Sequence, residues 1–247
     1  MAKFKALLLD IEGTITSISF VKDELFPYAY KNVENFLTQH FDEQPVQDCI
    51  REMVTVSKEL SAADSEVKEV RQNSQAETVA DLVHNVRHWI DVDKKVTPMK
   101  TLQGLIWEDA YKSGAVKGHL YPDVVPVLEE VQKSGRRIYI YSSGSVHAQK
   151  LLFQNSVNGD ITKLLSGYFD THVGLKGEAT SYQKISEEIG TPAADILFLT
   201  DVEAEAQAAR SAGCQTRLVV RPGNAQLSEE ARKNYDVIKS LDEIRTL

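Results

Sequence analysis

Four short runs of apolar residues occur along the chain, and each is followed by polar residues. The runs occupy residues 4–9, 137–141, 196–200 and 216–220. Short runs that are apolar throughout are typical of parallel strands covered on both faces. Residues 124–131 have apolar positions at helical spacing and residues 204–212 are rich in alanine, and a glycine that can end a helix follows each stretch. This alternation predicts an α/β protein with a parallel sheet.

The segment between the first two predicted strands has a different pattern. Apolar residues recur there every three or four positions, as in amphipathic helices, within residues 25–37, 79–90 and 99–106. Residues 61–75 are polar and charged, which favours an exposed helix or a connector. Because no strand pattern occurs in this segment, we predict a helical insert at residues 19–119 within an α/β core of residues 1–18 and 120–247.

The composition is that of an ordinary globular protein of 247 residues, with 42% hydrophobic and 26% charged residues. The formal net charge of −8 opposes broad binding to nucleic acid or to an anionic membrane, so we expect neither as a partner. The apolar runs are too short for a membrane span or a secretion signal. We therefore expect a cytoplasmic protein, small enough to enter the nucleus passively. We also expect it to be a monomer. Cys49 and Cys214 lack the spacing of a zinc site or a disulfide framework, and we expect packed thiols.

Groups suited to a divalent cation and a phosphate follow three of the predicted strands. Asp10 and Glu12 follow the first strand, residues 142–145 (Ser-Ser-Gly-Ser) follow the second, and Asp201 follows the third. Magnesium prefers oxygen ligands, and hydroxyls and amides at a helix start bind anions. A helix cap or a turn explains each group taken alone. Their joint occurrence beyond the carboxyl ends of successive strands, where ligands bind in open α/β sheets, predicts a shared site.

The same residues carry a resemblance to a known superfamily, the haloacid-dehalogenase-like hydrolases. Its four motifs match, in order, Asp10, Ser142, Lys176 and Asp201. Longer blocks resemble one branch, the enolase-phosphatases (acireductone synthases) of methionine salvage; they span residues 10–14, 18–22, 25–28, 102–107, 139–153, 196–201 and 220–225. Glu12 supports this branch, because most phosphatases of the superfamily have aspartate at that position. The resemblance implies a Rossmann-like parallel sheet with a helical cap inserted after the first strand.

The resemblance also implies a catalytic centre. Asp10 would be the nucleophile that forms an aspartyl-phosphate. Asp10, Glu12 and Asp201 would hold one Mg²⁺, with Glu12 contributing its backbone, its side chain or both. Lys176 would stabilise the nucleophile and the phosphate together.

Phosphate binding and the substrate follow from the same resemblance. Ser142 and the amide of Ser143 would bind the phosphate, and Lys176 would bind it as well. The small-molecule substrate would be 2,3-diketo-5-methylthiopentyl 1-phosphate, which is enolised and then dephosphorylated to the acireductone. Enolisation requires a base that removes a proton alpha to a carbonyl. Glu12 is the candidate, because its longer side chain could reach substrate carbon while staying near the metal.

Other interpretations of the chain remain open or fit poorly. A related Mg²⁺-dependent phosphomonoesterase could act on another small ester, such as a sugar phosphate or phosphoglycolate. A phospho-acceptor receiver domain is about half this length and has no helical insert. A dinucleotide-binding oxidoreductase is disfavoured because no Gly-x-Gly-x-x-Gly follows the first predicted strand.

Several polar residues have a simple structural explanation. His84 and His88 have the i, i+4 spacing of helical metal ligands but no third ligand nearby, so we do not expect a metal there. Glu205 follows Asp201 by four residues and could support the metal site, but we expect a solvent-exposed helix acid. A tight turn would explain residues 221–224 (Arg-Pro-Gly-Asn) fully.

Overall fold

The computed structural model describes residues 4–92 and 94–245. The chain divides into two compact units, one of Met1–Phe20 with Lys117–Leu247 and the other of Val21–Val116. The borders predicted from the sequence lie after residues 18 and 119. That the second unit acts as a cap stays a prediction.

A six-stranded parallel sheet forms the centre of the first unit, in the order β3-β2-β1-β4-β5-β6. The strands are β1 (Ala6–Leu9), β2 (Arg137–Tyr141), β3 (Gly167–Phe169), β4 (Ile196–Thr200), β5 (Gln215–Val219) and β6 (Asp236–Ile238). β1 lies in the middle, with Leu9 in register with Ile140 of β2 and Leu199 of β4. This arrangement confirms the predicted parallel α/β fold.

The two edge strands are absent from the sequence prediction. β3 and β6 have three residues each and are only partly buried, so they lack the continuous apolar run of a central strand. The four predicted strands are all present, with small differences at their ends. β1 begins at Ala6, two residues later than predicted, and β5 begins and ends one residue earlier.

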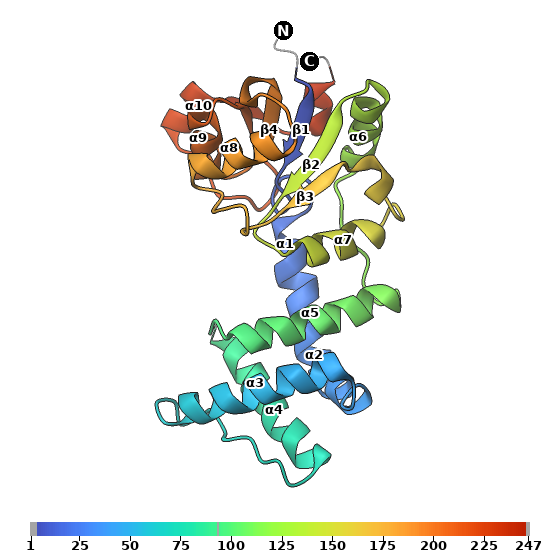
Figure 1. Cartoon of the computed structure of the whole chain (residues 1–247), viewed down its shortest axis with the longest axis vertical. Coiled ribbons are helices and arrows are strands. Elements are labelled where there is room, and N and C mark those ends of the chain that lie inside the picture. The colour runs from blue at the N-terminus through green and yellow to red at the C-terminus, as the bar shows by residue number, and fades with distance from the viewer. Residues whose placement is uncertain (1–3, 93, 246–247) are drawn as a thin grey trace. The chain divides into compact units, whose positions relative to one another are not determined.

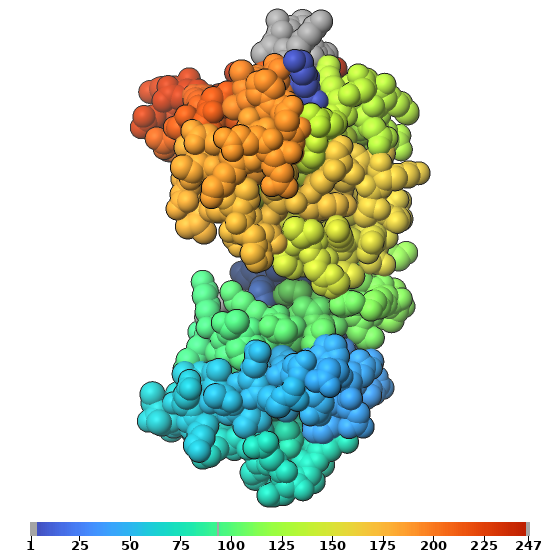
Figure 2. All heavy atoms as spheres, viewed as in Figure 1, coloured from blue at the N-terminus to red at the C-terminus, as the bar shows by residue number. Residues whose placement is uncertain are grey.

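Helices cover both faces of this sheet (Figure 1). They are α6 (Val124–Lys133), α7 (Val146–Gln154), α8 (Ala179–Glu188), α9 (Glu203–Ser211) and α10 (Glu229–Asn234). A short helix, α1 (Ile18–Phe20), follows β1 in the chain. On one face, Leu8, Tyr141 and Phe198 belong to a single buried cluster with Tyr182 and Ile185 of α8. All four residues of β1 are buried, and later segments of the chain cover most of the first unit's surface on the face shown in Figure 2.

The second unit is helical, as predicted. It contains a π-helical turn (Val21–Leu25), α2 (Phe26–Gln39), α3 (Gln44–Ser61), α4 (Gln75–Asp91) and α5 (Thr97–Lys112). No strand occurs among its described residues. The apolar faces of the four helices form one buried core that includes Val33, Met53, Leu82 and Leu102. No helix in the described part of the chain is both long and apolar enough to cross a membrane.

Residues 62–74 form an irregular connector between α3 and α4, which decides between the two predicted alternatives. The side chains of Val67 and Val70 are buried in the core of the helical unit. Arg71 forms an ion pair with Asp81 of α4, with Nε 2.7 Å from Oδ2. Polar contacts to α4 and two buried valine side chains therefore hold the connector in place.

The two cysteines are both buried, as predicted for packed thiols.

Candidate active site at the carboxyl edge of the sheet

Three candidate residues of the site directly follow strands that lie side by side. Asp10 follows β1, Ser142 follows β2 and Asp201 follows β4. Because the strands are parallel and in register, their carboxyl ends meet at one edge of the sheet. The amide of Asp10 donates a hydrogen bond of 3.0 Å to the carbonyl of Leu199, which ties the end of β1 to β4.

Lys176 reaches the same edge from the loop between β3 and α8. Its Nζ lies 2.5 Å from Oδ1 of Asp10 and 2.8 Å from Oε2 of Glu205. The carbonyl of Lys176 accepts a 2.7 Å hydrogen bond from the Tyr182 hydroxyl, which holds the loop against the buried face of α8. Burial alone would lower the pKa of Lys176, but the charges of Asp10 and Glu205 outweigh it and raise this pKa overall. A charged ammonium is therefore fixed beside the Asp10 carboxylate.

The turn after β1 brings further groups to Asp10. The Thr14 hydroxyl donates a 3.1 Å hydrogen bond to Oδ2 of Asp10, so both carboxylate oxygens of Asp10 have partners. Gly13 has a φ of +74°, a conformation that L side chains rarely adopt. A Cβ on Gly13 would lie only 2.4 Å from Oδ2 of Asp201. Glycine is required here because Asp201 packs directly against the turn.

Burial and like charge raise the pKa values of two further carboxyl groups. Burial, followed by the negative charge of Asp10, raises the pKa of Asp201 to about 7. Loss of hydration and the charge of Asp10 also raise the pKa of Glu12, although part of the Glu12 side chain is exposed to solvent. The edge of the sheet thus concentrates more negative charge than Lys176 alone balances, and a bound cation would relieve this repulsion.

The oxygen atoms at this edge fit a sparsely coordinated magnesium ion. Within residues 4–92 and 94–245, no group of three or more His, Cys, Asp and Glu side chains is placed to hold a metal ion. Magnesium is commonly bound through one or two carboxylates, with water and a substrate phosphate completing its octahedron. Asp10 and Asp201, from adjacent strands, can supply such a pair. The backbone carbonyl of Glu12 is a third oxygen source.

The residues after β2 form a polar turn that starts α7, as predicted. Ser142 is buried, and its Oγ accepts a 3.2 Å hydrogen bond from the amide of Gly144. The Ser145 hydroxyl accepts from the amide of Ala148 at 3.2 Å and caps the helix. Ser143 is exposed between them. Hydroxyls and amides at a helix start can bind a phosphate group.

Glu205 is a further functional candidate at this edge of the sheet. The expectation of a solvent-exposed acid is wrong, because its carboxylate is mostly buried, pairs with Lys176 and accepts a 2.7 Å hydrogen bond from the Thr200 hydroxyl. Burial and the charge of Asp10 raise the pKa of Glu205, although Lys176 opposes them. The spacing of four residues from Asp201 predicts that Glu205 lies in the first turn of the helix that follows, as it does in α9. It does not indicate that Glu205 faces Lys176.

The turn at residues 221–224 also does more than reverse the chain. The turn itself is present, with a 3.2 Å bond from the Asn224 amide to the Arg221 carbonyl. However, Nε of Arg221 donates to the Thr14 carbonyl at 3.1 Å, and Nδ2 of Asn224 donates to the Gly13 carbonyl at 2.9 Å. The expectation that a tight turn explains this segment fully is therefore wrong, since both side chains hold the loop that follows Asp10.

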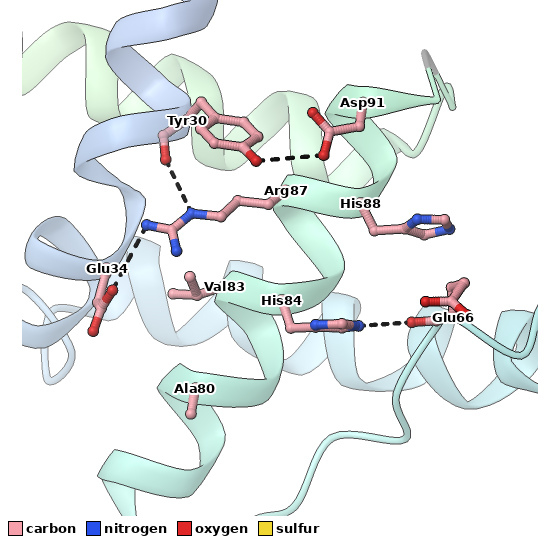
Figure 3. A pocket seen from close by; sticks show the side chains of 9 residues that line it. All are labelled: Tyr30, Glu34, Glu66, Ala80, Val83, His84, Arg87, His88 and Asp91. Atoms are coloured by element: carbon pink, nitrogen blue, oxygen red, sulfur yellow. Dashed lines mark hydrogen bonds and ion pairs between the residues drawn. The ribbon is translucent and has the colours of Figure 1, made fainter.

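A separate hollow of about 510 Å³ lies on the helical unit (Figure 3). His84 and His88 line it, but each bonds to the connector: His84 Nε2 lies 2.8 Å from the Glu66 carbonyl, and His88 Nε2 lies 3.1 Å from Oδ2 of Asp64. Arg87, also in the lining, bonds to the Tyr30 carbonyl. These contacts assign both histidines a structural role in holding the connector against α4.

The chain is similar to known proteins both in sequence and in structure. The chain matches the haloacid dehalogenase-like hydrolase family over residues 4–213. It is 61% identical over 242 residues to Enolase-phosphatase E1 of Caenorhabditis briggsae, covering 98% of this chain and 97% of that protein. Enolase-phosphatase E1 of Danio rerio is 42% identical over 257 residues, covering 98% and 95%. The crystal structure of the UTR4 protein of Saccharomyces cerevisiae is similar with a TM-score of 0.77 at 33% identity, covering 98% of this chain and all of that chain.

Proposed function

The chain belongs to the haloacid dehalogenase-like hydrolases and, within them, to the enolase-phosphatases. We propose how its residues perform the two reactions, enolisation of the substrate and its dephosphorylation. The proposed substrate is 2,3-diketo-5-methylthiopentyl 1-phosphate, and the product is the acireductone of methionine salvage. One observation carries the proposal: Lys176 and Asp10 form a buried ion pair at the sheet edge where Ser142 and Asp201 also lie. A cation beside a strand-end carboxylate suits attack on a phosphate ester.

Asp10, Asp201 and Glu12 would hold one Mg²⁺, with Glu12 contributing its backbone, its side chain or both. When bound, the ion screens the repulsion between the carboxylate and the phosphate and stabilises charge on the transferring phosphoryl group. The oxygen-rich donor set and the raised pKa values of Asp201 and Glu12 support this assignment. Ser142, the amide of Ser143 and Lys176 would bind the phosphate oxygens.

Phosphoryl transfer would proceed in two displacements at phosphorus. A carboxylate oxygen of Asp10 attacks first, so that an Asp10 O–P bond forms while the bond from phosphorus to the substrate oxygen breaks. The leaving oxygen keeps the electron pair and takes up a proton. Water then attacks phosphorus and gives up a proton, which balances the proton taken up by the leaving oxygen. The Asp10 O–P bond breaks, so inorganic phosphate is released and the Asp10 carboxylate is restored. Two displacements replace one difficult hydrolysis by two steps with lower barriers.

Glu12 would be the base for the enolisation that precedes this transfer. A base needs access to the substrate and a pKa near the working pH. The Glu12 side chain is partly exposed to solvent, and its pKa is raised above the ordinary value for a glutamate. The proton alpha to the carbonyl would pass to a carboxylate oxygen of Glu12, and the electron pair of the C–H bond would remain in the substrate as an enolate. Positive charge close to the enolate oxygen would lower the cost of this step.

Stopped-flow turnover of the diketopentyl phosphate tests the proposal, with enediol absorbance and phosphate release recorded separately. We expect both signals with Mg²⁺ and the loss of phosphate release after chelation. Glu12→Asp should slow enolisation far more than it slows dephosphorylation of a pre-formed enol phosphate. A proportional loss of both activities would contradict the role of Glu12. Rapid turnover of sugar phosphates or phosphoglycolate without turnover of the diketone would instead favour another phosphomonoesterase.

A further inference from the structure

The side chain of Asn224 reaches from the turn at residues 221–224 to the loop that follows Asp10. Its Nδ2 donates to the Gly13 carbonyl at 2.9 Å and to the Val219 carbonyl at 3.4 Å. Both hydrogens of the amide group are therefore used. The exchanged orientation of the amide would point Oδ1 at these two carbonyl oxygens, which cannot donate, so the contacts define which atom is the oxygen.

The other end of the amide has no partner in the described part of the chain. Oδ1 of Asn224 is buried and receives no hydrogen bond from the described residues. Buried side-chain oxygens are nearly always hydrogen-bonded, and an exception often marks a bound water or ion. Oδ1 of Asn224 is thus an acceptor in need of a donor.

The position of this oxygen indicates where the donor belongs. A Cβ placed on Gly13 would lie 3.0 Å from Oδ1 of Asn224 and 2.4 Å from Oδ2 of Asp201. Both oxygens therefore approach the same side of the Gly13 α-carbon. An unpaired acceptor oxygen on the same side of Gly13 as a carboxylate proposed to bind Mg²⁺ is a suitable partner for a water molecule bound to that ion.

We propose that Asn224 is a positioning residue for the Mg²⁺ ion: its Oδ1 accepts a hydrogen bond from a water molecule in the hydration shell of the ion. The inference rests on the metal site of the proposed function. Magnesium gives up its water reluctantly and keeps several molecules when bound by few carboxylates. Residues that hydrogen-bond to the ligands of a metal change its affinity by about 10- to 100-fold.

Calorimetric titration of Mg²⁺ into the metal-free protein, without substrate, tests this role. Asn224→Ala removes the acceptor and should weaken Mg²⁺ binding about 10- to 100-fold. Asn224→Asp keeps an acceptor oxygen but lacks the amide donor, and it should bind Mg²⁺ as tightly as the wild type or more tightly. Loss of the bond to Gly13 is measured separately, as a fall in melting temperature that both variants share in the absence of metal.

The outcomes separate this inference from the metal site on which it rests. Wild-type affinity in Asn224→Ala would overturn the role of Asn224 alone. An equal loss in Asn224→Ala and Asn224→Asp would also overturn it, because the bond to Gly13 would then explain both. If the wild type bound no Mg²⁺, or if Asp201→Asn bound it unchanged, the metal site and this inference would fail together.

Discussion

The ammonium nitrogen of Lys176 lies 2.5 Å from Oδ1 of Asp10, although 166 residues separate the two positions in the chain. The same nitrogen lies 2.8 Å from the carboxylate of Glu205. One buried cation therefore faces two carboxylates, with the Asp201 carboxyl group packed against the Gly13 turn close by. The pair orients the Asp10 carboxylate, and the surplus of acidic groups explains why the edge of the sheet suits a divalent cation.

Replacement of Lys176 should impair phosphate release, and it should also lower stability, because it leaves Asp10 and Glu205 without their buried cation. We expect Lys176→Met to lower kcat about 10²- to 10³-fold, the usual loss when one group that stabilises transition-state charge is removed. Glu205→Gln should cause a smaller loss, because Lys176 keeps its contact with Asp10. Steady-state phosphate release measures the effect, and circular dichroism checks the fold. Near wild-type turnover in Lys176→Met would exclude Lys176 from the reaction.

Gly13 offers a test of the close approach of Asp201, with Gly135 as its matched control. Both glycines have positive φ, +74° and +81°, but a Cβ on Gly135 would meet no atom within 4 Å. We expect each alanine substitution to destabilise the fold by about 1–2 kcal/mol through backbone strain. Only Gly13→Ala should also weaken Mg²⁺ binding and abolish phosphate release, because its methyl group displaces Asp201. Equal activity in the two variants would contradict the contact.

The raised pKa of Asp201 predicts how metal-free stability depends on pH. Burial and Asp10 raise this pKa to about 7, whereas the ordinary value is 3.8. At a pH between 3.8 and about 7, Asp201 has lost its proton in the unfolded chain but keeps it in the folded protein. Asp201 therefore contributes stability that is full at low pH and lost as pH rises through about 7.

Two measurements check this dependence on pH. Without metal, the contribution of Asp201 should lower the melting temperature as pH rises from about 5 to about 8, and Asp201→Asn should reduce that decline. The affinity for Mg²⁺ should rise over the same range, because binding displaces the proton. Equal Mg²⁺ affinity at both ends of the range would contradict the assignment.

The ion pair of Arg221 and Asp123 should be important for the stability of the first unit. Nη2 of Arg221 lies 2.7 Å from Oδ2 of Asp123, and both side chains are largely buried. Burial raises the pKa of Asp123, but hydrogen bonds from Arg221 and the Leu241 amide lower it overall. Arg221→Gln should reduce the free energy of unfolding by about 3–5 kcal/mol, since it leaves a buried charge unpaired. Urea unfolding measures the loss.

A double variant provides the control for this pair. Asp123→Asn removes the unpaired charge, so Arg221→Gln combined with Asp123→Asn should lose less stability than the two single variants together. Strict additivity would show that the two side chains do not stabilise each other.

The central strands and the residues at their ends can be predicted from the sequence. β1, β2 and β4 are continuous apolar runs because both faces are covered, and the first polar residue after each run marks its carboxyl end. Asp10, Ser142 and Asp201 therefore follow from the pattern alone. The helical unit follows equally well from its apolar spacing.

The contacts across the site cannot be predicted in this way. Lys176 lies in a polar loop after β3, a strand too short to leave a pattern, so only the family resemblance identifies it. Glu205 and Asn224 have the residue types of an ordinary helix acid and an ordinary turn. Their roles depend on which way the side chains face after the chain has folded, and that direction has no local signal.

The aspartyl-phosphate mechanism can be examined by following the phosphorylation state of Asp10 during turnover. Substrate and Mg²⁺ would be mixed with the wild type, quenched rapidly in acid, and digested for mass spectrometry of the peptide that contains Asp10. We predict a mass gain of one phosphoryl group on Asp10 that forms before phosphate is released, and no gain and no turnover in Asp10→Asn. Phosphate release at the wild-type rate from Asp10→Asn, or turnover without any phosphorylated peptide, would contradict the account.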